Sequence, residues 1–189
     1  MNDKHVYIVG GANGTGKTTV AKEFISISHQ YFLNADEIAK EYNPLDTEGG
    51  KIEAGRELKK RLETLIQKGD SFVIESTLSG LYMQKMIAKL KLLGYKISLL
   101  YVFLDNVEMS IERVEIRFKE GGHYIPEEDI RRRYTRSRVN FWNKYRFLVD
   151  EWNLFYNGNS NAFLVAWGED ETYQTVDPKT MSKFMESVS

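Results

Sequence analysis

Short apolar runs and amphipathic segments alternate along most of the chain. Runs of apolar and β-branched residues predict strands at 6–9, 31–33, 71–75, 96–104, 152–156 and 162–167. Between them, apolar residues recur at spacings of three and four, which predicts helices at 18–28, 52–68, 83–93 and 107–119, and another that starts near Pro126. This alternation predicts an α/β fold with a mainly parallel sheet and right-handed crossovers.

The first predicted strand leads into a glycine-rich loop. Gly11, Gly16, Lys17 and Thr18 occupy the fixed positions of the G-x-x-x-x-G-K-[ST] template, and a helical pattern follows. Glycine lets backbone N–H groups approach phosphate oxygens, and the N-terminus of the next helix adds partial positive charge. We therefore predict a phosphate-binding loop whose nucleotide-binding residues are Gly11, Ala12, Asn13, Gly14, Thr15, Gly16, Lys17, Thr18 and Thr19.

Two side chains of this loop have distinct expected roles. Lys17 is placed to reach the β- and γ-phosphates of a nucleotide, and the hydroxyl of Thr18 is placed to bind a metal ion. ATP and Mg²⁺ are therefore the expected ligands of the loop.

Acidic residues follow the second and third predicted strands. The carboxyl ends of parallel strands lie at one rim of the sheet, where ligands bind in this class of fold. A helix cap and a functional carboxylate explain Asp36 equally well. Glu75 ends the apolar strand 71–75, where a buried carboxylate needs a cation, a metal-bound water or a substrate hydroxyl. The position of Glu75 favours a functional role over a structural ion pair.

Seven of the ten arginines lie between Arg113 and Arg138. A run of charges is usually a solvated face, but arginine dominates over lysine here, and arginine binds phosphate through paired hydrogen bonds. Two adjacent glycines separate the two predicted helices of this stretch. We predict that residues 107–147 form a mobile helical lid over the triphosphate, in which Arg113 and Arg117, one turn apart, contact one ligand.

The remaining connections carry weaker signals. Turns are predicted at Asn43-Pro44, 47–50, His123 and 158–161. Gly168 and the acidic residues after it are expected to form a loop at the rim where a nucleotide base rests. Residues 178–188 form a weakly helical tail with no assigned role.

Composition narrows the class of protein. The chain has 189 residues, of which 42% are hydrophobic and 28% charged, which suits one domain over 1–189. It has no cysteine, so disulfides and thiolate metal sites are excluded. The N-terminus enters the first strand without an apolar signal core, and no apolar run is long enough to span a bilayer, so we expect a cytoplasmic protein without a membrane partner. The net charge of -1 argues against binding nucleic acid by bulk electrostatics.

The chain resembles the zeta-toxin-like family of P-loop kinases. The resemblance rests on four stretches in this order: GGANGTGKTT, FLNADEIAKEYNP, FVIESTLSG and RVEIRFKEGGHYIPEEDIRRRYTRSRVNFW. It implies a three-layer α/β/α P-loop fold of the kinase type, with a five- or six-stranded mainly parallel sheet and a helical lid. It also implies phosphorylation of a sugar hydroxyl, as in family members that act on UDP-N-acetylglucosamine, and an antitoxin-like protein partner.

The resemblance also assigns roles to residues. Asp36 matches the catalytic aspartate that accepts the hydroxyl proton. Glu75 matches the acid that holds the sugar substrate, and Thr77 of the same stretch is a further expected substrate-binding residue. The arginines that steady the transferred phosphoryl group lie among Arg113, Arg117, Arg132 and Arg133, and the expected catalytic residues are Lys17, Asp36, Arg117 and Arg132.

The sequence therefore favours a kinase that transfers the γ-phosphate of ATP to a hydroxyl of a small molecule, with a sugar or nucleotide sugar as acceptor. Two alternatives stay open. One is an ATPase that uses hydrolysis to switch conformation, which would not need a carboxylate aimed at a hydroxyl. The other is a kinase of nucleic-acid ends or a binding module, for which affinity would fall steeply with salt.

Overall fold

The computed structural model describes residues 4–42, 51–122, 124–158, 161–169 and 171–188. The predicted turns at Asn43-Pro44, 47–50 and His123 lie outside these residues. The elements, in chain order, are β1 (His5–Gly10), α1 (Lys17–Ser28), β2 (Tyr31–Leu33), α2 (Ala35–Tyr42), α3 (Lys51–Lys68), β3 (Phe72–Ser76), α4 (Tyr82–Leu92), β4 (Lys96–Phe103), α5 (Val107–Lys119), α6 (Glu127–Asn143), the 3-10 turn η1 (Tyr145–Phe147), β5 (Glu151–Tyr156), β6 (Phe163–Glu169), β7 (Thr172–Thr175) and α7 (Pro178–Glu186).

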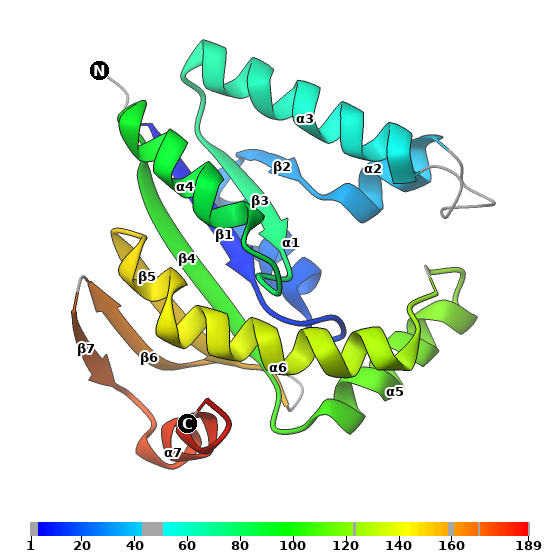
Figure 1. Cartoon of the computed structure of the whole chain (residues 1–189), viewed down its shortest axis with the longest axis vertical. Coiled ribbons are helices and arrows are strands. Elements are labelled where there is room, and N and C mark those ends of the chain that lie inside the picture. The colour runs from blue at the N-terminus through cyan, green and yellow to red at the C-terminus, as the bar shows by residue number, and fades with distance from the viewer. Residues whose placement is uncertain (1–3, 43–50, 123, 159–160, 170, 189) are drawn as a thin grey trace.

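The strands form one seven-stranded sheet in the order β2-β3-β1-β4-β5-β6-β7 (Figure 1). Strands β1 to β5 are parallel, β6 pairs antiparallel with β5, and β7 pairs antiparallel with β6. The predicted α/β class and mainly parallel sheet are therefore confirmed. The sheet has one strand more than predicted, because β7 is a short run, TYQT, without the apolar residues that mark the other strands.

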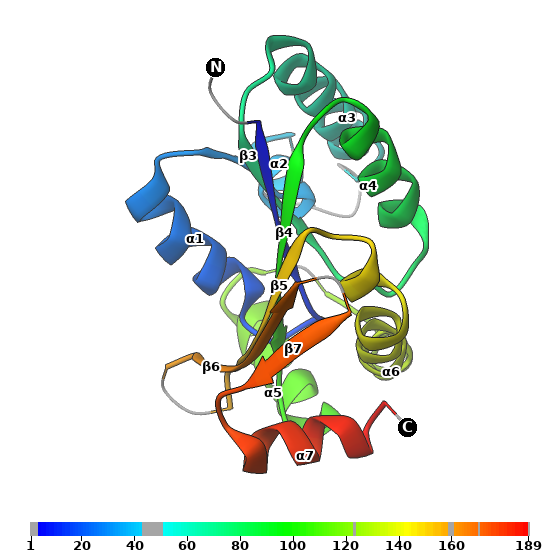
Figure 2. The same cartoon turned by 90° about the vertical axis from the view of Figure 1, so that its left-hand side faces the viewer.

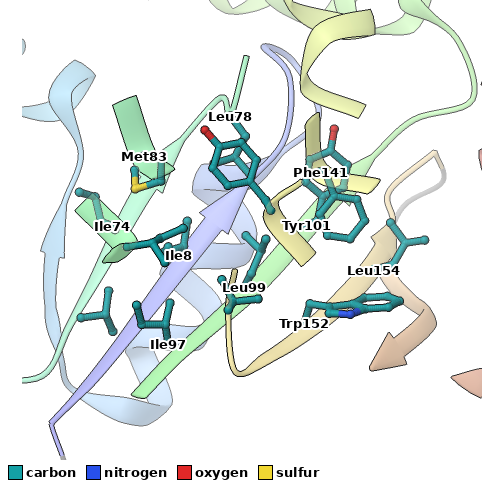
Figure 3. Close-up of a cluster of buried hydrophobic side chains, with 14 of the residues drawn as sticks. Ile8, Ile74, Leu78, Met83, Ile97, Leu99, Tyr101, Phe141, Trp152 and Leu154 are labelled. Carbon is teal, nitrogen blue, oxygen red and sulfur yellow. The ribbon is translucent and has the colours of Figure 1, made fainter. Parts of the chain in front are cut away.

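Helices cover the two faces of the sheet unequally (Figure 2). On one face, α1 packs on a small cluster around Val9, Val73 and Val102. On the other face, α3, α4, α6 and α7 enclose the main core (Figure 3), in which Ile8, Leu99, Tyr101, Phe141 and Trp152 lie at most 1% exposed. The central strands are apolar on both faces because both are covered.

The C-terminal segment, which the sequence predicts as weakly helical without assigning it a role, is part of this core. Asp177 caps α7 by accepting a hydrogen bond from the Thr180 N–H at 2.8 Å, and Pro178 occupies the first turn. Phe184 is fully buried and makes edge contacts with the rings of Tyr101 and Phe103.

The predicted base-binding loop at Gly168 is wrong. Gly168 pairs with Trp152 at the start of β5, so it lies at the edge of the sheet opposite the carboxyl rim. The reason is the direction of β6: a connection of a few residues after Tyr156 permits only an antiparallel return. At the rim itself, the residues that follow β5 are Asn157 and Gly158.

Candidate active site

A cavity of about 740 Å³ opens at the carboxyl rim of the parallel strands. The phosphate-binding loop, the start of α2 and the end of β3 line it, and α5, α6 and the residue after β5 complete the wall. Its polar lining residues include Asn13, Lys17, Thr18, Asn34, Asp36, Glu75, Thr77, Arg113, Arg117, Arg133 and Asn157. The structure thus brings together most of the residues that the sequence singled out.

Glycine is required at two positions of the phosphate-binding loop. Gly11 and Gly14 have positive φ angles of +145° and +78°. A Cβ on Gly11 would lie 2.3 Å from the Val102 carbonyl oxygen, and one on Gly14 would lie 2.4 Å from the Ser110 carbonyl oxygen. Because both clashes are with backbone, no side-chain movement relieves them, and the loop is a cradle that a Cβ would fill.

Lys17 is the first residue of α1 and is only 6% exposed. Its ammonium donates to the Ala12 carbonyl at 2.7 Å and lies 3.7 Å from Glu75 Oε1. Burial lowers the pKa of Lys17, while the carboxylates of Glu75 and Asp36 raise it and the cation of Arg117 lowers it further. The ammonium is thus held inside the loop by groups that compensate its desolvation.

Glu75 faces the phosphate-binding loop. Its Oε2 accepts hydrogen bonds from the Thr18 hydroxyl at 2.8 Å and from the Asn34 amide at 2.7 Å, while Oε1 faces Lys17. One carboxylate oxygen therefore faces Lys17 and the other bonds to Thr18, and both of these residues belong to the phosphate-binding loop and the start of α1. The ion pair with Lys17 exists, and it belongs to the cavity wall rather than to a remote structural site.

Asp36 is not the cap of α2. Asn34 has that role, because its Oδ1 accepts from the backbone N–H groups of Asp36 at 2.8 Å and Glu37 at 3.1 Å. The Asp36 side chain lines the cavity instead, and among the described residues it has no hydrogen-bond donor or ion-pair partner. The structure therefore rules out the helix cap, and the functional role of Asp36 stays a prediction.

Three arginines of α5 and α6 line the cavity, and Arg132 is not one of them. Arg132 is 52% exposed and pairs with Asp129 at 2.6 Å, whereas its neighbour Arg133 reaches the loop residue Asn13 at 3.4 Å. Adjacent residues on a helix point about 100° apart, so only one of the two can face the cavity. The expectation that Arg132 contacts phosphate is therefore wrong in position, and Arg133 is in its place.

Arg117 has guanidinium N–H groups that are buried and not hydrogen-bonded to the described part of the chain. Its Nε and Nη2 are buried, yet they have no hydrogen-bond partner among the described residues. Buried guanidinium donors without an acceptor are costly, so an anion that accepted from them in the cavity would be stabilised. Arg113, one turn earlier, lies within 3.5 Å of the Gly158 carbonyl oxygen.

Fewer residues than the predicted 107–147 lie at the cavity in the structure. The C-terminal half of α6 is embedded in the core, with Ser137 and Phe141 fully buried. Tyr134 also donates to the Leu104 carbonyl at 2.9 Å. Of the described residues in this segment, the cavity is lined by residues of α5, by 124–126 and by the first turns of α6.

Sequence reasoning missed two residues of the site. Asn34 bridges the α2 cap and Glu75, and Asn157 donates to the Thr15 carbonyl at 2.9 Å. Each follows the last residue of a parallel strand by one position, which is the signal that would have identified both.

The oxygen donors at the loop fit a magnesium ion. The Thr18 hydroxyl and the Glu75 carboxylate are hydrogen-bonded to each other beside Lys17, and Mg²⁺ prefers such oxygen ligands together with substrate phosphates. The described residues contain no group of three or more His, Cys, Asp or Glu side chains that would form a separate metal centre.

This fold and this site define a P-loop kinase: a parallel sheet, a phosphate-binding loop between β1 and α1, and a carboxylate and arginines facing the loop across one cavity. The chain belongs to the Zeta toxin family, whose model matches residues 2–166. The family predicted from the sequence is thereby confirmed. No helix in the described part of the chain is long and apolar enough to cross a membrane.

Known proteins resemble the chain in sequence and fold. An uncharacterised protein of Haemophilus influenzae is 32% identical over 134 residues, which cover 71% of this chain and 94% of that protein. The crystal structure of AvrRxo1-ORF1:-ORF2 with ATP matches with a TM-score of 0.75 at 19% identity, over 96% of this chain and 63% of that chain. A chain of the PezAT toxin–antitoxin system of Streptococcus pneumoniae matches with a TM-score of 0.63 at 18% identity, over 100% of this chain and 87% of that one. The two structural likenesses concern the fold.

Proposed function

We propose that the protein transfers the γ-phosphoryl group of ATP to a hydroxyl of a small molecule, with a sugar or nucleotide sugar as acceptor. One observation carries this proposal: the Asp36 carboxylate, without a protein partner among the described residues, shares one cavity with the phosphate-binding loop. A free carboxylate beside the transferred phosphate is what deprotonation of an acceptor hydroxyl requires. Membership of the Zeta toxin family supports the same reaction.

The site residues divide into a donor half and an acceptor half. Backbone N–H groups of the loop and Lys17 hold the phosphates of ATP, and Arg117 meets the negative charge that develops on the equatorial oxygens. Mg²⁺, held by Thr18 with Glu75 behind it, would neutralise charge on the phosphates. Asp36 orients the acceptor hydroxyl and takes its proton, and Thr77 contributes a hydroxyl to the acceptor wall.

The acceptor is identified by incubating the protein with γ-labelled ATP, Mg²⁺ and a bacterial metabolite extract, and finding the phosphorylated product by mass spectrometry. UDP-N-acetylglucosamine is the first pure compound to test. Lys17→Ala should abolish labelling, and Thr135→Ala, on the exposed side of α6, should not change it. Steady ATP hydrolysis that no acceptor stimulates would contradict the proposal and favour an ATPase.

We further propose a protein partner of the antitoxin kind. Support comes from the family, and from two similar structures whose proteins were crystallised as AvrRxo1-ORF1 with AvrRxo1-ORF2 and as part of the PezAT toxin–antitoxin system. Expression in Escherichia coli with and without a candidate neighbour protein tests this, because a toxin arrests growth only when its partner is absent.

A further inference from the structure

The loop between β3 and α4 contains a residue in an unfavourable conformation. Leu78 has a φ of +54°, a left-handed value that a leucine rarely adopts. Among the described residues other than glycine, only His29 also has a positive φ, and His29 is an ordinary helix C-cap. Leu78 follows Thr77 of the acceptor wall directly, so its strain lies beside the site.

Helix α6 and the turn after it bind this loop through its backbone. The Ser137 hydroxyl donates to the Thr77 carbonyl at 2.5 Å, and the Asn140 amide donates to the Leu78 carbonyl at 3.0 Å. In η1, the Tyr145 hydroxyl donates to the Gly80 carbonyl at 2.5 Å. All three donors are buried, so each replaces a water that the loop would otherwise need.

The side chain of Leu78 also holds the loop in place. It is 1% exposed and packs on Gly10, where an added Cβ would lie 2.5 Å from Leu78 Cδ1. Gly10 is the last residue of β1, directly before the phosphate-binding loop. Figure 3 shows Leu78 at the top of the buried cluster, above Ile8 and Leu99 of the strands.

The same helix also touches the donor half. Arg133, one turn before Ser137, lines the cavity and donates to the Asn13 side chain at 3.4 Å. Helix α6 therefore contacts both the phosphate-binding loop and the backbone of the loop 77–80. A rigid helix that contacts both loops sets the distance between them.

We propose that Ser137, Asn140 and Tyr145 are positioning residues that hold Thr77 and Leu78 in the geometry needed to bind the phosphate acceptor. This inference rests on the proposed phosphotransfer, in which Thr77 lies on the acceptor side. The three residues act on carbonyl groups of an irregular loop, which neither a strand nor a helix would otherwise hold in place. Without them, Leu78 relaxes toward negative φ and Thr77 moves away from the cavity.

The test compares Asn140→Ala, Ser137→Ala and Tyr145→Phe with two controls. Thr135→Ala alters the exposed side of α6, and Val165→Ala removes buried volume from β6 without touching the loop. Hydrogen–deuterium exchange of a peptide covering 76–82 reports the loop itself. Binding of ATP reports the donor half of the site. The acceptor half is reported by the ratio of γ-label transferred to small molecules of a metabolite extract to γ-label released as phosphate by hydrolysis.

For the three positioning variants we expect loop amides to exchange at least tenfold faster, and transfer to acceptors to fall at least tenfold relative to hydrolysis. The affinity for ATP should stay within about twofold of the wild type. Val165→Ala should lower the melting temperature without changing the exchange or the ratio of acceptor labelling to hydrolysis.

Unchanged exchange over 76–82 in both Asn140→Ala and Ser137→Ala would overturn the positioning role. The positioning role would also be overturned if these variants showed faster exchange over 76–82 but the same ratio of acceptor labelling to hydrolysis as the wild type. If the wild-type protein transfers no label to any acceptor, the proposed function fails instead, and the exchange measurement still decides whether α6 holds the loop.

Discussion

Glu75→Gln discriminates between the two roles open to this residue. The sequence assigns Glu75 to the acceptor, whereas in the structure its oxygens contact Lys17, Thr18 and Asn34. A glutamine keeps the shape, and its amide oxygen can still accept from Thr18 and Asn34. The substitution therefore removes the negative charge and the ion pair and little else.

The size of the effect follows from the two hydrogen bonds at Oε2. A hydrogen bond to a charged group contributes about 1.5–3 kcal/mol and a neutral one about 0.5–1.5 kcal/mol, so each bond loses about 1–1.5 kcal/mol. For both bonds the loss is about 2–3 kcal/mol, which corresponds to about 30- to 140-fold in an equilibrium or a rate. We expect the apparent Mg²⁺ affinity in the presence of ATP to weaken by up to this factor.

A pH profile gives an independent readout of the same variant. Glu75 is the largest influence that raises the pKa of Lys17 against burial, so the pKa of Lys17 falls further when the carboxylate is removed. The lysine is charged below its pKa and loses the charge as the pH rises through it. The alkaline limb of ATP binding should therefore move to lower pH in Glu75→Gln.

The assay is a titration of Mg²⁺ against a fluorescent ATP analogue, repeated with EDTA and followed by turnover with the identified acceptor. Thr77→Val is the matched control, because it removes a hydroxyl of the cavity wall that bonds to Ser79 at 2.9 Å within its own loop. It should change only the KM for the acceptor. If Glu75→Gln raises the acceptor KM and leaves the Mg²⁺ dependence unchanged, the placement of Glu75 in the donor half is refuted.

Three further variants test other parts of the site. Asp36→Asn should abolish transfer while ATP still binds and the melting temperature holds, since Asn34 caps α2; retained transfer rules out Asp36 as the base. Arg117→Ala should lower turnover by about 10²-fold or more if it acts as an arginine finger, whereas Arg132→Ala should be nearly neutral; the reverse order in steady-state kinetics would contradict the placement. Leu78→Gly should unfold at a denaturant concentration no lower than Leu78→Ala, because only glycine adopts the positive φ without strain; a clearly weaker glycine variant argues against that strain.

The sequence was sufficient for the donor half of the site because the chemistry is local. The expected roles of residues Gly11 to Thr19 follow from their positions in one short motif. The strand pattern before the motif and the helix pattern after it predict how the phosphate-binding loop is oriented. Parallel strands then bring Asp36 and Glu75 to the same rim, which the alternation of elements already implied.

What the sequence could not determine depends on helix rotation and strand direction. Arg132 and Arg133 lie three and four positions after Asp129 and both pair with it, and only the packing of α6 decides which of them faces the cavity. A base-binding loop at Gly168 would require β6 to be parallel to β5, so that its end lies at the carboxyl rim. The short connection after Tyr156 carried the opposite signal.

The buried half of α6 also limits how the cavity can close. Since Tyr134 and Asn140 bind backbone carbonyls of the rim, closure by rotation of the whole helix pair would break bonds of the core. The C-terminus of α5 is joined to the glycine turn, where the Gly122 N–H donates to the Arg117 carbonyl at 2.8 Å. The turn therefore contacts the arginine whose Nε and Nη2 line the cavity region without a hydrogen-bond partner among the described residues.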